Sequence, residues 1–198
     1  MKTNEKAIEM IKRYEGFRSH AYQCSAGRWT IGFGHTGSVK KGDFIRREDA
    51  EKLLLADLVK YEKMVAQIDA KGQYNFNSNE FSALVSFAFN VGNVKTVTAN
   101  GTRNKKQIAN AMLKYRCATI NGKKRVLAGL EKRRKEEVAL FNKPVDNYTA
   151  PCVTTFDEVV KMVISGKLGN GAIRKKRVTE LGFNYSQVQK EVNRRLKK

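Results

Sequence analysis

The sequence predicts an α+β domain followed by a small, separate bundle of helices. Three observations lead to this prediction: a glycine-rich stretch at 16–46 interrupts a helical pattern, residues 141–151 contain both prolines of the chain, and three short helical segments come after them. A chain of 198 residues, 41% of them hydrophobic, is long enough for one ordinary domain and a smaller one. We therefore expect a first domain at 1–143, a linker at 144–154 and a helical module at 155–198.

An amphipathic helix opens the chain. Ile8, Ile11 and Glu15 are spaced at i, i+3 and i+7, so they share one face of a helix that starts near Asn4. Glu15 therefore continues an apolar stripe at the end of this helix. An acid at such a position is often no more than an exposed residue of the last turn. On a partly buried face, however, desolvation raises the pKa of a carboxyl group toward the value that a general acid needs.

Short aromatic and β-branched runs, such as Trp29-Thr-Ile-Gly-Phe33, alternate with glycines over residues 16–46, and this pattern predicts a small twisted sheet. Strand alternation places Trp29 on the face opposite to Thr30, and we expect Trp29 in the core. Helical spacing returns after this stretch in four segments, which are 47–68, 78–93, 103–115 and 126–141. These segments predict the helical part of the domain.

The net charge of the chain indicates which classes of molecule it can bind. The chain has 39 Lys and Arg against 19 Asp and Glu, which gives a net charge of +20. A charge of this size attracts anionic partners over long distances. Nucleic acid, an anionic cell envelope and an acidic membrane surface all fit, and charge alone does not choose among them.

The cysteines predict free thiols. Cys24, Cys117 and Cys152 are odd in number and far apart, and their spacing is not that of metal ligands. We expect neither a metal nor an organic cofactor. The N-terminal segment places charges among its apolar positions and lacks the apolar core of a signal peptide, and no segment has the roughly 18 apolar residues of a membrane span. If the protein acts outside the cytoplasm, another factor must release it.

Several ordered motifs carry a family resemblance over residues 4–142. Glu15, Cys24 and Thr30 are separated by eight and by five residues, and Ile31-Gly-Phe-Gly-His-Thr-Gly37 follows them. Further matches are Asp49-Ala-Glu-Lys-Leu-Leu-Leu-Ala-Asp57, Phe81-Ser-Ala-Leu-Val-Ser-Phe-Ala-Phe-Asn-Val-Gly92 and Gly129-Leu-Glu-Lys-Arg-Arg134. In this order and at this spacing, the motifs closely resemble the phage lysozymes, or endolysins, of glycoside hydrolase family 24.

The resemblance implies a two-lobed fold with the active cleft between a small β-lobe and a helical lobe. It also implies hydrolysis of the β-1,4 bond between N-acetylmuramic acid and N-acetylglucosamine in peptidoglycan. Glu15 resembles the general acid of the family, Cys24 occupies the place of its second catalytic residue, and Thr30 that of the hydroxyl that positions water. The second position is usually Asp in the family, so Cys24 departs from the usual pattern.

Three further residues have expected roles near this cleft. Asn90 and Arg133 match positions that face the cleft in relatives, and we expect them to contact substrate. For His35 we expect a structural hydrogen-bonding role in the β-lobe rather than catalysis.

A second resemblance covers residues 156–193. The loop Gly166-Lys-Leu-Gly-Asn-Gly171, followed by Arg174-Lys-Lys-Arg177, is similar to the choline-independent, three-helix cell-wall-binding repeats of some phage lysins, which bind muropeptide. The wall contacts that this implies are Leu168, Gly169, Asn170, Gly171 and Arg174. Two alternatives are a solvated basic bundle and a helix-turn-helix module that reads DNA.

Together these features predict an endolysin that acts as a monomer on peptidoglycan glycan strands and muropeptide, without nucleic acid as a partner. We expect it to be made in the host cytoplasm and to reach the wall through a membrane lesion. Two functions of other classes stay open. One is a catalytically inactive wall-binding protein, in which Cys24 marks lost chemistry, and the other is a basic nucleic-acid-binding protein.

Overall fold

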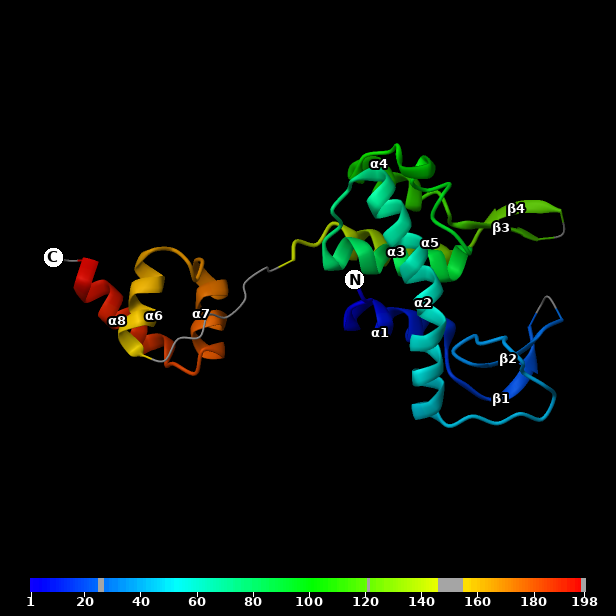
Figure 1. Cartoon of the computed structure of the whole chain (residues 1–198), viewed down its shortest axis with the longest axis horizontal. Helices are drawn as coiled ribbons and strands as arrows, with labels where there is room; N and C mark the ends of the chain where they lie inside the picture. The colour runs from blue at the N-terminus through cyan, green and yellow to red at the C-terminus, as the bar shows by residue number, and fades with distance from the viewer. Residues whose placement is uncertain (25–26, 121, 146–154, 197–198) are drawn as a thin grey trace. The chain divides into compact units, whose positions relative to one another are not determined.

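The computed structural model describes residues 1–24, 27–120, 122–145 and 155–196. Its internal contacts divide the chain into two compact units, Met1–Val145 and Asp146–Lys198. This division falls inside the linker predicted at 144–154. Most of that linker, including Cys152, lies outside the described residues. The predicted fold class, an α+β domain followed by a three-helix bundle, is confirmed (Figure 1).

The first helix, α1 (Glu5–Glu15), begins and ends as its sequence predicts. The Asn4 side chain caps it by accepting a hydrogen bond from the backbone N–H of Ala7 at 3.1 Å. Ile8 and Ile11 are buried on one face, with 9% and 0% of their surface exposed. Gly16 ends the helix with a φ of 69°, a conformation that glycine adopts at little cost. Glu15 is therefore the last helical residue before the chain enters the sheet.

The glycine-rich stretch forms an antiparallel hairpin, β1 (Arg18–Gln23) and β2 (Trp29–Gly32). Figure 1 shows α1 leading directly into it. Gln23 pairs with Trp29 and Tyr22 with Thr30, and the register shifts earlier in β1, between Arg18 and Tyr22. The expectation for Trp29 is wrong. Thr30 is buried, with 3% of its surface exposed, whereas Trp29 is half-buried and lies outside the packed core. Ile31 is 5% exposed, so burial begins one residue into the strand, after Trp29.

Four helices form the remainder of the core of the first unit. They are α2 (Arg47–Gly72), α3 (Ser78–Val91), α4 (Lys105–Met112) and α5 (Ala128–Phe141), and a 3₁₀ turn, η1 (Ala99–Gly101), precedes α4. Every residue from Asn79 to Ala88 of α3 is buried. A helix buried on all sides is a central one, and α3 packs against α1, α2 and α5. Helices α3 and α5 therefore carry side chains that can meet behind Glu15.

A second hairpin, which the helical pattern did not predict, connects α4 to α5. It consists of β3 (Cys117–Ile120) and β4 (Lys123–Val126), paired without a register shift. The Asn-Gly pair at 121–122 is a known hairpin signal in a sequence, and it lies between the two strands. All four residues of β4 are exposed, so no apolar alternation marked this strand.

The second unit is a bundle of α6 (Phe156–Ile164), α7 (Gly171–Glu180) and α8 (Tyr185–Leu196). Its core consists of Val159, Val160, Val163, Leu168, Val178, Val188 and Val192. Leu168 is completely buried, so the expectation that it contacts the wall is wrong. A leucine at this point of the loop supplies the bundle with core volume that a unit this small needs. Leu196, the last residue of α8, is 66% exposed and does not belong to this core.

Among the described residues, no helix combines the length and the apolar character needed to cross a bilayer.

Candidate active site

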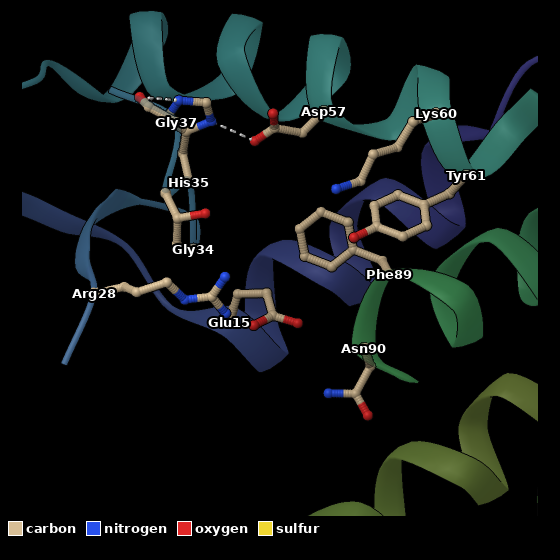
Figure 2. A pocket seen from close by; sticks show the side chains of 11 residues that line it. Glu15, Arg28, Gly34, His35, Gly37, Asp57, Lys60, Tyr61, Phe89 and Asn90 are labelled. Carbon is tan, nitrogen blue, oxygen red and sulfur yellow. Dashed lines mark hydrogen bonds and ion pairs between the residues drawn. The ribbon is translucent and has the colours of Figure 1, made fainter. Parts of the chain in front are cut away.

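A pocket of about 440 Å³ lies beside the end of α1. This volume is within the usual range for ligand sites. Figure 2 shows side chains converging on it from α1, from the β2 region, from α2 and from the end of α3. The lining residues are Glu15, Arg28, Gly34, His35, Thr36, Gly37, Asp57, Lys60, Tyr61, Phe89 and Asn90.

The two carboxyl oxygens of Glu15 have different surroundings. Oε1 accepts a hydrogen bond from Nη1 of Arg133 at 2.6 Å. Oε2 lies toward Gly34, where a Cβ atom would stand 3.8 Å from it. The Glu15 side chain is 22% exposed, so it is partly withdrawn from water but still reachable. One oxygen is thus held by the protein, and the other faces a residue of the pocket wall.

A buried network of charges lies behind Glu15. Arg133 donates from Nε to Oε1 of Glu137 at 3.1 Å, and Arg134 Nε lies 3.1 Å from Oε2 of the same carboxylate. The Ser86 hydroxyl donates to Glu137 Oε1 at 2.8 Å. Arg133 is 3% exposed, and Arg134 and Glu137 are fully buried. Burial raises the pKa of the Glu137 carboxyl, and the two guanidinium groups and the Ser86 hydroxyl act against that change. The buried network therefore contains two guanidinium groups and one carboxyl group.

His35 connects the β-lobe to α2 on the opposite wall of the pocket. Its Nδ1 lies 2.8 Å from Oδ2 of Asp57, and its Nε2 lies 2.9 Å from the carbonyl oxygen of Gly37 (Figure 2). Both ring nitrogens are therefore engaged within the protein. This geometry agrees with the expected structural role of His35.

Cys24 and Thr30 meet at the backbone of Arg28. The N–H of Cys24 donates to the Arg28 carbonyl oxygen at 2.9 Å, and the Thr30 hydroxyl donates to the same oxygen at 3.1 Å. Cys24 is half-buried and Thr30 is buried. Neither residue lines the pocket itself, although the Arg28 side chain between them does. The structure thus places both residues next to the pocket wall rather than on it.

The two expected substrate contacts differ in their positions. Asn90 lines the pocket, and its Oδ1 accepts a hydrogen bond from Nη2 of Arg134 at 2.9 Å. Arg133 does not line the pocket, so we correct its role: its guanidinium is buried and bonded to Glu15, Glu137 and the Ser86 carbonyl oxygen. Because its guanidinium is engaged inside the protein, Arg133 holds the carboxyl group of Glu15 in place and does not contact substrate.

Apart from Asn90, the sequence analysis missed the residues of α2 and α3 that line the pocket. Tyr61 and Phe89 line it and pack edge to face, with ring centroids 5.4 Å apart. Asp57 and Lys60 also line it. The spacing of Asp57 and Tyr61, four residues apart on one helix, places them on one face. This spacing could have indicated that the two residues share a face of the helix, but it does not show that this face meets the β-lobe.

The comparison with known families decides the identity of the first unit. The family model described as phage lysozyme matches residues 12–137. This chain belongs to the phage lysozyme family. The match includes Glu15, the whole pocket lining and the buried network, and it makes the chain a peptidoglycan hydrolase of the lysozyme type.

Individual relatives agree with this assignment. The chain is 38% identical over 147 residues to the endolysin of Acyrthosiphon pisum secondary endosymbiont phage 1, with 71% of this chain and 98% of that relative covered. It is 36% identical to the endolysin of Lactococcus phage c2, covering 74% of this chain and 63% of the relative. Among solved structures, the muramidase domain of SpmX from Asticaccaulis excentricus is 38% identical, with a TM-score of 0.65 over 72% of this chain and 99% of that one.

The second unit of this phage lysozyme family member matches a CW_7 repeat over residues 157–196. In its glycine loop, Arg174 donates from Nε to the carbonyl oxygen of Gly169 at 2.9 Å and from Nη2 to Oδ1 of Asn170 at 2.6 Å. Gly169 and Gly171 have φ values of 74° and 54°, which favour glycine. Arg174 therefore fixes the loop whose residues were expected to contact the wall.

The buried network generates a stability prediction for Glu137. Glu137→Gln should lower the free energy of unfolding of the first unit by about 3–5 kcal/mol, because it removes the carboxylate that pairs with both buried guanidinium groups and leaves Arg133 with Glu15 alone. Urea unfolding of the full chain, followed by the fluorescence of Trp29, measures this. The matched control is Glu136→Gln on the same helix, whose ion-pair partner Arg13 is 62% exposed, and it should cost at most about 1 kcal/mol. Equal losses for both variants would contradict the prediction.

Proposed function

We propose that this phage lysozyme family member is an N-acetylmuramidase. It hydrolyses the β-1,4 bond between N-acetylmuramic acid and N-acetylglucosamine in peptidoglycan and so lyses the host cell, acting as a monomer. The observation that carries the proposal is the placement of Glu15, with one oxygen bound by Arg133 and the other directed toward a pocket of about 440 Å³. The similarity to the muramidase domain of SpmX supports this choice of bond.

In the proposed reaction Glu15 is the general acid. Glycosidases of this type protonate the leaving oxygen of the scissile bond from a carboxylic acid, while a second group assists on the other side of the sugar. Glu15 Oε2 carries the proton, since Oε1 is occupied by the Arg133 guanidinium. Arg133 acts as a positioning residue, because it fixes the carboxyl group without itself reaching the pocket. Asn90, on the pocket wall, binds the glycan.

Cys24 and Thr30 form the second part of the proposed site. Both hydrogen-bond to the Arg28 carbonyl oxygen, so they are held close to one another at the pocket edge. A thiol with an ordinary pKa of about 8.5 is only a few per cent ionised at neutral pH, whereas an aspartate there would be almost fully ionised. If position 24 activates the water, the thiolate fraction limits the rate near neutral pH.

The C-terminal CW_7 repeat supplies wall binding. The Arg174 contacts hold Gly169 and Asn170 in one loop conformation, which lowers the entropy cost of binding a muropeptide. Gly169, Asn170, Gly171 and Arg174 are the contacts we propose. One repeat binds the wall with modest affinity, because it lacks the avidity that tandem modules provide.

The first test concerns Glu15. Glu15→Gln keeps the size and hydrogen-bonding ability of the side chain but carries no transferable proton, so turnover should fall about 100-fold or more. Mass spectrometry of the muropeptides released by the wild-type chain should find N-acetylmuramic acid at the new reducing ends. A Glu15→Gln variant that keeps most of its turnover would remove Glu15 from the mechanism. Fragments ending in N-acetylglucosamine, or cut in the peptide, would reject the muramidase proposal.

The second test concerns Cys24. Wild-type activity on soluble glycan should rise with pH as the thiolate fraction rises, until Glu15 loses its proton. Cys24→Asp should remain active and flatten this rise, and Cys24→Ala should lose most of its activity. A Cys117→Ser, Cys152→Ser variant should be inactivated by thiol alkylation as fully as the wild type. If Cys24→Ala works normally at every pH, then Thr30 or the pocket geometry positions the water and Cys24 has no catalytic role.

The third test separates binding from catalysis. A chain ending at Val145 keeps the whole first unit, so it should cut soluble glycan fragments at close to the wild-type rate. Without the CW_7 repeat, a smaller fraction should sediment with intact wall sacculi. Equal sedimentation of the shortened and the full chain would refute the binding role of the repeat.

A further inference from the structure

The pocket contains two cations that the protein does not neutralise. Its two acids each have a partner inside the fold: Glu15 binds Arg133, and Asp57 lies 2.8 Å from His35. The pocket is also lined by Arg28 and Lys60, and neither has a carboxylate within ion-pair distance among the residues that the structure describes. The charge left for an incoming ligand is therefore positive.

These two cations enter the pocket from different sides. Lys60 extends from α2, and Arg28 from the residue directly before β2, with its guanidinium pointing toward Glu15 (Figure 2). The Lys60 ammonium stands 4.7 Å from the centroid of the Tyr61 ring. A cation–π contact of this kind limits the positions of a long, exposed side chain. Both positive groups thus border the space beside the proposed acid.

We propose that Lys60 and Arg28 are specificity residues that bind a carboxylate on the stem peptide attached to muramic acid. The inference rests on the proposed muramidase function and deepens it. Stem peptides of peptidoglycan carry free carboxylates, whereas a neutral glycan such as a chitin oligomer has none. Arginine binds a carboxylate through a planar pair of N–H groups, and lysine contributes a compact charge. The pair favours peptide-bearing glycan strands over neutral ones.

Long-range attraction by the whole protein does not account for this selectivity. The net charge of +20 attracts any anionic polymer, and every exposed lysine contributes to it in a similar way. Lys63 offers a matched comparison, since it is exposed on the same helix, three residues after Lys60, and does not line the pocket. A local contact requires that Lys60 matters and Lys63 does not.

The experiment measures kcat and KM of the full chain on two soluble glycan fragments from the same wall material. One fragment keeps its stem carboxylates, and in the other they are converted to neutral amides. Lys60→Gln and Arg28→Gln should each raise KM for the carboxylate fragment about ten-fold, the size expected when one charge-assisted hydrogen bond is lost. KM for the amidated fragment should not change. Lys60→Arg should restore most of the affinity, and Lys63→Gln should behave as the wild type on both fragments.

Three results would overturn the inference. The first is an unchanged KM for Lys60→Gln and Arg28→Gln on the carboxylate fragment. The second is an equal loss on both fragments, which would indicate a structural role. The third is an effect of Lys63→Gln as large as that of Lys60→Gln. These outcomes leave the muramidase proposal intact if the wild-type chain releases N-acetylmuramic acid ends, whereas a wild-type chain that cuts neither fragment overturns both.

Discussion

A carboxylate without any exposed surface, Glu137, fixes the geometry of the active site. It holds Arg133 and Arg134 on one turn of α5, and Arg133 in turn holds Glu15 at the end of α1. Burying three charged side chains costs free energy, and the network offsets this cost only while each charge has its partners. The site therefore depends on α1 and α5 packing against the buried helix α3, which also supplies Ser86 to the network.

The same constraint sets the surroundings of the two carboxyl groups that line the pocket. Arg133 contacts the carboxyl group of Glu15 from behind, and His35 Nδ1 lies 2.8 Å from Oδ2 of Asp57. Arg28 and Lys60 also line the pocket, and neither has an ion-pair partner among the described residues. The same network gives the two oxygens of Glu15 different surroundings, because Arg133 binds Oε1 and leaves Oε2 toward Gly34. A general acid needs one oxygen from which it can donate its proton.

Much of this could be predicted from the sequence, because local spacing determines it. The register of Ile8, Ile11 and Glu15 places the acid at the end of a helix, and the glycines place a hairpin after it. The Arg133 contact could not be predicted in this way, since its partner is 118 residues away and periodicity gives a face but not the neighbour of that face. Leu168 illustrates the opposite error: a leucine in a glycine-rich loop resembled a ligand contact, yet the loop folds it into the core of the bundle.

The central claim is that Arg133 acts through Glu15, and a double-mutant cycle on turnover tests it most directly. Arg133→Gln alone should lower kcat at least about ten-fold, because the carboxyl group of Glu15 loses its fixed position. In the Glu15→Gln background the same substitution should change kcat by less than about two-fold, because residues that act as one unit are not additive. Losses that multiply, in variants that circular dichroism finds folded, would contradict the account.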